Sequence, residues 1–363
     1  MREKRNWTPV WKIVAIGAIL GSQAGLSHAQ SSVTLYGVVD GGLLYTSRTL
    51  NPATGGSAGH QFSFIDGGSA GSRFGLKGTE DLGGGIKAIF ALESGIDLAN
   101  GGFGNSNGNF FGRQAWVGLT GGFGTVQAGL QYSPFVLSII DTDARNVSYF
   151  GSGGVIYVGS VLSTGLFNPN AVTYTSPVIA GLQGSVMWAL GGEAGDFQAG
   201  RQYAARLKYT LGGLTVDAAL YDGNAGGTAA SIPVPSTVEF TGRTIGGAYE
   251  FGKLTLKASF VNYKVAGSFD NRVYSGGFSY LVTPGLNADA GVWYTSDGND
   301  TANHSILAVV GTEYFLSKAT DIYAQVGFVN NHGKMNTGLS LNGALYGPAG
   351  STTGVNIGIR HSF

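Results

Sequence analysis

The sequence predicts an all-β protein: a closed antiparallel transmembrane β-barrel of about sixteen strands, with short periplasmic turns and long extracellular loops. Three observations predict this fold. Glycine supplies 63 of the 363 residues and aromatic side chains 12%, whereas charged side chains also reach only 12%, which excludes a typical soluble surface. Apolar and polar side chains alternate along most of the chain, which is the period of a strand. The connections between these segments are short and long in turn, as in outer-membrane barrels.

Residues 1–29 have the pattern of a secretory signal peptide. A basic segment, MREKRNWTPVWK, precedes a short apolar segment, IVAIGAILGSQAGL, and the small residues SHA occupy positions 27–29. The apolar segment is too short for a membrane helix, and no later stretch is long and apolar enough to be one. We expect an exported protein whose residues 30–363 form a single barrel domain.

Charge and cysteine content exclude several kinds of partner. Without the four basic residues and one acidic residue of the signal, the remaining chain has a formal charge of −3, so a nucleic-acid partner is not expected. There is no cysteine, which excludes disulfides and metal sites built on thiolates. The histidines are too far apart in sequence to form a metal-ligand motif, so we expect no metal and no cofactor.

The alternation places charged residues on one face and apolar residues on the other. It is clear in the segments 33–45, 72–79, 86–93, 254–260, 286–294 and 321–328. One apolar face would also suit a soluble sandwich or barrel. However, these apolar faces carry hardly a charge, and a Lys or Arg at the lipid midplane costs about 2–4 kcal/mol. The pattern therefore favours a barrel in a membrane.

The connections give the strand count. Seven short turns are expected at 80–85, 120–124, 176–181, 210–213, 250–253, 282–285 and 316–320. Eight long polar loops are expected near 47–68, 98–108, 133–170, 190–200, 222–239, 265–271, 297–303 and 331–352. Together these fifteen connections join sixteen strands.

The C-terminal segment VNIGIRHSF keeps the alternation to its last residue, Phe363. An open strand edge is not tolerated in lipid, so we expect this segment to pair with the first strand and close the barrel. Phe363 would then lie at the periplasmic rim, where aromatic girdles are found.

Several segments together resemble the trimeric general porins of Gram-negative outer membranes, in the branch common in beta-proteobacteria. They are SSVTLYGVVDGGL at 31–43, SRFGLKGTEDLGGGIKAIFALESG at 72–95, FFGRQAWVGLTGGFGTVQAGLQYSP at 110–134, VTYTSP at 172–177 and IGIRHSF at 357–363. The resemblance implies a homotrimer with one pore per subunit and a third long loop folded into the lumen. It also implies that Phe363 is read by the machinery that inserts barrels.

Parity places Arg73, Lys77 and Arg113 on the lumen side of adjacent strands. The resemblance implies that arginines matching Arg73 and Arg113 stand at the pore constriction. Members of the family usually have a further arginine just before the segment VTYTSP, where this chain has Asn168 and Asn170. This departure removes a positive charge from the expected constriction. The alternative for the three basic residues is a solvated lumen wall away from the narrowest point.

The longest loop, 133–170, is the expected constriction loop, because a long loop in a compact fold is usually functional. It carries Asp141 and Asp143. Folded inward, these acids would face the basic wall and produce a transverse field across the pore. The alternative is that they are solvent-exposed turn residues.

These features predict a water-filled outer-membrane channel for passive diffusion of ions and small hydrophilic solutes. The expected partners are two further copies of the chain, outer-membrane lipid and lipopolysaccharide, and the barrel-insertion machinery. A substrate-specific channel on the same fold is the main alternative, supported by the inward parity of Trp293 and Tyr323. A barrel enzyme would need a Ser/His/acid or Asp/His grouping, which does not stand out, and a plugged adhesive barrel would not conduct.

Overall fold

The structure is a computed structural model that describes residues 31–160, 166–227 and 236–363. The predicted signal peptide, residues 1–29, lies outside these ranges, as do residues 161–165 and 228–235 of two predicted loops. Within the described ranges, the chain has no helix that is long and apolar enough to cross a membrane.

Strands dominate the chain, and two short helices interrupt them. The elements are β1 (Ser32–Thr46), β2 (Gln61–Asp66), β3 (Arg73–Gly83), β4 (Ile86–Gly95), β5 (Gln114–Gly121), β6 (Gly124–Tyr132), α1 (Pro134–Thr142), α2 (Gly153–Ser160), β7 (Phe167–Thr175), β8 (Leu182–Ala189), β9 (Gln202–Leu211), β10 (Leu214–Gly223), β11 (Phe240–Phe251), β12 (Leu254–Val265), β13 (Asp270–Thr283), β14 (Leu286–Asp297), β15 (His304–Phe315), β16 (Thr320–His332), β17 (Thr337–Ser340), β18 (Ala344–Tyr346) and β19 (Gly350–Ser362).

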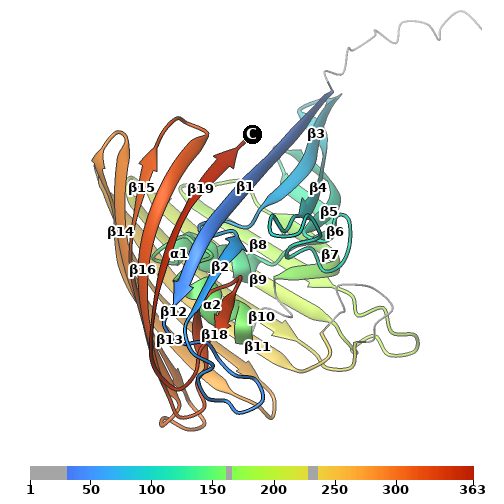
Figure 1. The fold of residues 1–363 in the computed structure, drawn as a ribbon. Helices are drawn as coiled ribbons and strands as arrows, with labels where there is room; N and C mark the ends of the chain where they lie inside the picture. The colour runs from blue at the N-terminus through green and yellow to red at the C-terminus, as the bar shows by residue number, and fades with distance from the viewer. Residues whose placement is uncertain (1–30, 161–165, 228–235) are drawn as a thin grey trace, which may run out of the picture.

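The strands form one closed antiparallel barrel with sixteen strand positions, as predicted (Figure 1). The sheet is made of seventeen strands, because β2 and β3 together occupy one of these positions and are separated by an interruption. Both pair with β1, β2 along residues 41–46 and β3 along residues 32–38. The other edge of β1 pairs with β19, from Val38 opposite Ser362 to Thr46 opposite Gly354. The predicted closure of the barrel by its first and last strands is therefore confirmed.

The interruption between β2 and β3 is organised by a buried carboxylate. Asp40 of β1 accepts backbone N–H bonds from Gly68, Ser69 and Ala70 at 3.1, 3.0 and 2.7 Å. The Tyr323 hydroxyl of β16 donates to the same carboxylate at 2.6 Å. A buried charge needs such partners, so Asp40 and Tyr323 have a structural role in holding the chain where it leaves the sheet.

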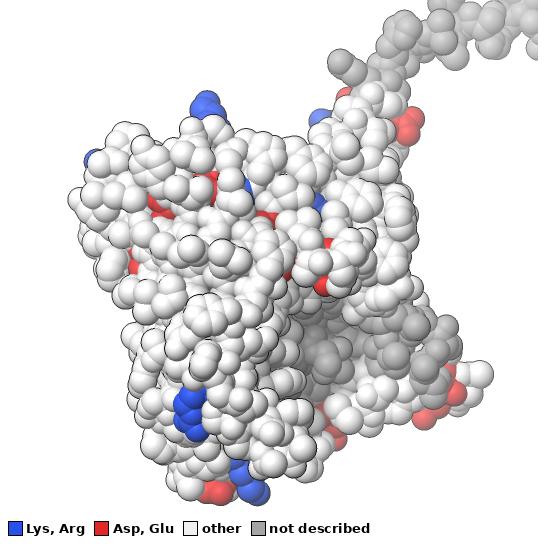
Figure 2. Space-filling view, in the orientation of Figure 1, with Lys and Arg blue, Asp and Glu red and all other residues white. Residues whose placement is uncertain are grey.

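The predicted alternation of faces is observed. On β1, Val33 and Leu35 face outward and are 64% and 58% exposed, whereas Asp40 is fully buried on the inner face. The face drawn in Figure 2 is mostly uncharged, with a few acidic residues spread across its upper half and basic residues in its lower part and at the top. This distribution suits a sheet whose outer surface is surrounded by hydrocarbon.

All seven predicted turns join consecutive strands. The turn after β3 shows why glycine is frequent there: Gly83, Gly84 and Gly85 all have positive φ, at +85°, +63° and +79°. Such backbone conformations are unfavourable for residues with a side chain. The Asp81 carboxylate also accepts the Gly83 N–H at 2.8 Å, which fixes the turn.

Two of the predicted long loops contain whole strands that the alternation did not reveal: the range 47–68 includes β2, and the range 331–352 includes the β17–β18 hairpin. The ranges 133–170, 222–239, 265–271 and 297–303 overlap the ends of adjoining strands by a few residues, as at Phe167 of β7. Glycine and asparagine are common in these segments and conceal short strands. The predicted loop bounds are wrong at these positions.

Two long loops meet inside the barrel. α1 and α2 lie within the ring of strands (Figure 1), and α1 packs against β9, β10, β11 and β12. The loop between β16 and β19 turns back to join them: the Gly151 N–H donates to the Leu339 carbonyl, and the Leu341 N–H donates to the Tyr149 carbonyl, both at 2.8 Å. Leu339 is buried against Phe150 as a result.

Candidate pore constriction

The helix α1 begins immediately after β6 and is directed along the inner wall by local sequence. Ser133 caps it, accepting the Val136 N–H at 3.1 Å, and Pro134 occupies its first turn. Phe135 is fully buried over Gly242 of β11, where a Cβ would lie 2.5 Å from the phenyl ring. The glycine therefore makes room for the helix, and α1 is held against the lumen side of the sheet.

Asp141 lies near the end of α1 and contacts two cations of β9. Its carboxylate accepts bonds from Arg206 and from Lys208, the latter at 2.7 Å. Arg206 is shared with the buried Asp217 of β10, at 3.0 Å. Burial acts to raise the pKa of Asp141, but the Lys208 hydrogen bond and the Arg206 charge outweigh it and hold that pKa below its usual value.

Asp143 holds the segment after α1 in shape. Its carboxylate accepts backbone N–H bonds from Arg145, Val147 and Gly153 at 2.9, 2.8 and 3.0 Å. It also accepts the indole N–H of Trp293 on β14 at 3.0 Å. Asp143 is almost fully buried, so its contacts tie the loop to itself and to the wall.

Arg145 makes a further attachment of this loop to the barrel wall. Its guanidinium forms a salt bridge with Asp289 of β14 and donates to Gln325 of β16 at 2.7 Å. It also donates to the carbonyls of Phe150 and Gly151 at 2.7 and 3.0 Å. Polar contacts of the loop therefore extend along the inner wall from β9 to β16.

On the opposite side, Arg73 and Arg113 meet at one acid, Glu93 of β4. The Nε atom of Arg113 donates to Glu93 at 2.8 Å, and the Nε atom of Arg73 lies 3.7 Å from the other carboxylate oxygen. The hydroxyl of Tyr36 also donates to Glu93 at 3.1 Å. Arg113 further donates to the Tyr132 hydroxyl at 2.9 Å.

A cavity of about 550 Å³ separates this wall from the loop. From the wall it is lined by two basic residues and one acid, namely Arg73, Arg113 and Glu93. The facing loop contributes apolar and neutral polar side chains, namely Ile139, Ile140, Asn146, Val147 and Tyr149. Neither Asp141 nor Asp143 lines it. The cavity therefore has more positive than negative side chains among its lining residues.

The predicted site residues fall into two groups in space. Arg73 and Arg113 come together around Glu93, whereas Asp141 and Asp143 are held at other strands, by Arg206, Lys208 and Trp293. Lys77 does not line the cavity; its ammonium lies 5.2 Å from the ring centre of Tyr36. The expected direct opposition of the loop acids and the basic wall is not what these contacts show.

Glu93, Arg206 and Lys208 were not among the residues predicted for the site. Their partners come from segments as far as 67 residues away, as with Lys208 and Asp141.

The two asparagines at the position of the family's further arginine have structural roles. Asn168 is buried and accepts the Tyr221 hydroxyl bond at 3.2 Å, and Asn170 has a positive φ of +54°.

Trp293 and Tyr323 do not form an aromatic path along the lumen. Trp293 is fully buried beneath the loop, and Tyr323 is 4% exposed beside Asp40. Among the described residues, no group of three or more His, Cys, Asp and Glu side chains is placed to hold a metal ion.

Comparisons with known proteins agree with this architecture. The sequence profile of the Gram-negative porin family matches residues 14–334. An outer membrane porin protein of Bordetella pertussis is 30% identical, over 97% of this chain and 100% of that protein. The major outer membrane protein P.IB of Neisseria gonorrhoeae is 31% identical, over 83% of this chain and 89% of that protein.

Among solved structures, the anion-selective porin from Comamonas acidovorans is similar, with a TM-score of 0.79 and 26% identity. The match covers 92% of this chain and 100% of that one. Sequence, closed barrel and inward loop thus lead to the same assignment: the chain belongs to the Gram-negative porin family and forms a passive channel in the outer membrane.

Proposed function

We propose that ions and small hydrophilic solutes cross this barrel through the cavity between Glu93 and the loop, and that the channel prefers small anions. The observation that supports this proposal most directly is the lining of that cavity, where Arg73 and Arg113 share a single acid, Glu93. The nearest acids of the loop, Asp141 and Asp143, are engaged elsewhere. A cavity lining with excess positive charge raises the local concentration of anions and lowers that of cations.

Two features support the assignment of residues 133–170 as the constriction loop of a single barrel domain. Its α1 segment packs on the inner wall, and Arg145 ties its continuation to β14 and β16. The similarity to a solved porin described as anion-selective supports the same preference. The burial of Trp293 and Tyr323 removes the features that favoured a substrate-specific channel.

We further propose that the mature chain, residues 30–363, follows removal of the signal at 1–29 and assembles as a homotrimer. Family membership supports the trimer. The chain requires no cofactor and carries out no reaction in this proposal. Lipopolysaccharide and outer-membrane lipid surround it, and Phe363 serves as the insertion signal.

The test is the zero-current potential of the purified protein in a planar bilayer under a salt gradient. We expect an anion-selective sign for the native chain. Arg113→Gln and Arg73→Gln should each lower the anion-to-cation permeability ratio by up to about thirty-fold, because loss of a unit charge at ~4 Å in water raises the free energy of an anion and lowers that of a cation by about 1 kcal/mol each. Lys77→Gln is the matched control, since Lys77 lies on the same wall but outside the cavity, and its effect should be smaller.

A cation-selective native channel would contradict the proposed preference. Unchanged selectivity in both arginine variants would show that solutes pass elsewhere. A folded barrel without conductance would refute the pore itself and favour a plugged barrel.

A further inference from the structure

The outer face of β7–β11 carries an apolar groove with basic residues at its loop end. The inner face of these strands is fixed by contacts with α1: Asp217 joins the Arg206–Asp141 cluster, and Tyr221 lies against Phe135. Because side chains alternate, Ala218, Leu220 and Asp222 of β10 face outward. The groove is therefore on the membrane side of the barrel, not in the lumen.

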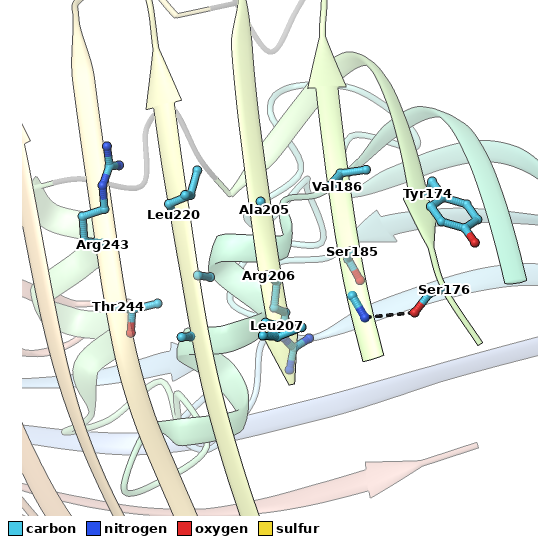
Figure 3. Close-up of a pocket in the computed structure, with 13 residues that line it drawn as sticks. Tyr174, Ser176, Ser185, Val186, Ala205, Arg206, Leu207, Leu220, Arg243 and Thr244 are labelled. Atoms are coloured by element: carbon cyan, nitrogen blue, oxygen red, sulfur yellow. Dashed lines mark hydrogen bonds between the residues drawn. The ribbon is translucent and has the colours of Figure 1, made fainter. Parts of the chain in front are cut away.

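Strand register builds the groove from small residues between larger ones. One outward row pairs Val186 with Ala205, Ala205 with Leu220, and Leu220 with Arg243 (Figure 3). The next row toward the turns pairs Gly184 with Leu207 and Leu207 with Ala218. The small residues Gly184, Ala205 and Ala218 leave a hollow of about 520 Å³. Larger side chains flank it, namely Val186, Leu207, Leu220 and Tyr174.

The next row toward the long loops is aromatic. Trp188 pairs with Tyr203, and their rings stack at 5.9 Å and 18°. Phe197 of the adjoining loop also stacks with Trp188, with 6.4 Å between the ring centres, and is 63% exposed. Aromatic rings at the end of an apolar band are typical of the membrane–water boundary.

Arg201 lies over these rings and has no carboxylate partner among the residues that the structure describes. Its guanidinium carbon is 5.0 Å from the Trp188 ring centre and 5.6 Å from that of Tyr203. Its buried Nε atom has no hydrogen-bond partner. A guanidinium in this state is suited to a phosphate, which accepts two parallel N–H bonds.

Arg243 is a second, weaker cation beside the groove. It is half-exposed, and it donates to the carbonyls of Tyr221 and Gly242 at 2.9 and 2.7 Å. It also forms a salt bridge of 3.1 Å with Asp222, whose negative charge partly offsets it. Arg201 therefore supplies the main attraction for an anionic head group, and Arg243 adds to it.

We propose that this surface, Arg201 with Trp188, Tyr203 and the groove below them, binds lipid A of lipopolysaccharide. An acyl chain would fill the groove over Ala205 and Ala218, while a glucosamine phosphate would contact Arg201. The head-group end faces the long loops, which is the side of the outer leaflet, where lipopolysaccharide is the phosphorylated lipid. This inference rests on the outer-membrane location of the proposed channel, and it assigns a lipid partner to particular residues.

The test uses the mature chain, refolded from denaturant so that it carries no native lipid, and native mass spectrometry with added diphosphoryl lipid A. We expect a retained lipid A on each subunit, and about ten-fold weaker binding for Arg201→Gln and for Ala205→Trp, which fills the groove. Arg272→Gln and Ala324→Trp are matched controls. They alter an outward arginine and an outward alanine on β13 and β16, away from the groove, and should bind as the native chain does.

Native-like binding by both Arg201→Gln and Ala205→Trp would overturn the proposal. Equal affinity for phosphatidylglycerol would also overturn it, because the site would then not distinguish the outer-leaflet lipid. Loss of the trimer in Ala205→Trp would show that the groove receives a second copy of the chain instead. Conductance of the same samples is measured separately, so a failed lipid site with intact channels leaves the proposed function standing.

Discussion

At the scale of single residues, the charge of the lumen depends on which cations already have an acid. Asp141 neutralises part of the charge of Arg206 and Lys208 on β9, and it does not contact the wall that carries Arg73. Glu93 does the same for Arg73 and Arg113. Acidic side chains outnumber basic ones by three in residues 30–363, so a count of charges alone would not predict an excess of positive charge at the cavity.

Replacing Asp141 by asparagine should therefore make the channel more anion-selective at neutral pH. The Asp141→Asn change removes a negative charge and leaves Arg206 with only Asp217. The zero-current potential in a salt gradient should shift further in the anion direction. Asp81→Asn is the control, because Asp81 lies in the turn after β3 and asparagine can still accept the Gly83 N–H. An unchanged potential in Asp141→Asn would mean that Arg206 and Lys208 do not face the ion path.

The same group predicts a pH dependence. The pKa of Asp141 is lowered in the folded chain, so its ion pairs stabilise the loop above the ordinary aspartate pKa of about 3.9. That contribution is lost as the pH falls through the lowered folded pKa. The anion preference of the native channel should thus rise as Asp141 is protonated in acid, and it should approach that of Asp141→Asn. If the two proteins stay equally far apart down to the lowest pH at which they conduct, another acid is responsible.

At the scale of elements, the strands were predictable and the loop contacts were not. Period-two alternation identified the strands because lipid and water impose opposite requirements on successive side chains. Alternation does not predict the path of residues 133–160. That path depends on contacts between residues distant in sequence, such as Arg145 with Asp289 and Phe135 with Gly242. For the same reason, parity indicated that Arg73 and Arg113 share the lumen wall, but it gave no information on their common partner, Glu93. β2 was missed because its six residues lie between glycine-rich segments.

The attachment of the inward loop depends on Arg145. Arg145→Ala should leave Asp289 buried without its cation, and breaking a buried pair in this way costs about 3–5 kcal/mol. We expect frequent partial closures in single-channel records and faster protease cleavage within residues 143–153, while the barrel remains folded. Arg48→Ala is the control, since Arg48 is half-buried and its guanidinium donates to two backbone carbonyls, those of Ala349 and Ser351, at 2.9 and 3.2 Å. Quiet, native-like openings in Arg145→Ala would contradict this role.

At the scale of the whole molecule, closure joins the two ends of the described chain. Gly37 and Phe363 exchange backbone hydrogen bonds of 2.9 and 3.1 Å. The Phe363 ring covers Gly37, where a Cβ would lie 2.4 Å from it. The sequence predicted this pairing from the alternation alone, since a barrel in lipid cannot leave an edge open.

The proposed signal role of Phe363 can be separated from its structural role. Phe363→Ala keeps the backbone bonds to Gly37, so the protein should refold in detergent with near-native yield. In cells its amount in the outer membrane should fall several-fold, because the insertion machinery no longer reads the terminal aromatic ring. Ile359→Ala is the control, because Ile359 lies on the same outer face and both side chains are 52% exposed. Equal depletion of both variants in cells would assign the loss to stability instead.

The loop between β16 and β19 has a consequence for how the cell-surface side of this protein can vary. Its Leu339 and Leu341 bond to the same segment, 149–151, that follows α1. A substitution or insertion there would disturb permeation as well as surface shape. The tip at 51–56 bonds mainly within itself, through Asn51 and Thr54. Changes in the tip at 51–56 should therefore leave permeation unaltered, whereas changes in the last loop should not, and the first loop is the better place for an inserted tag.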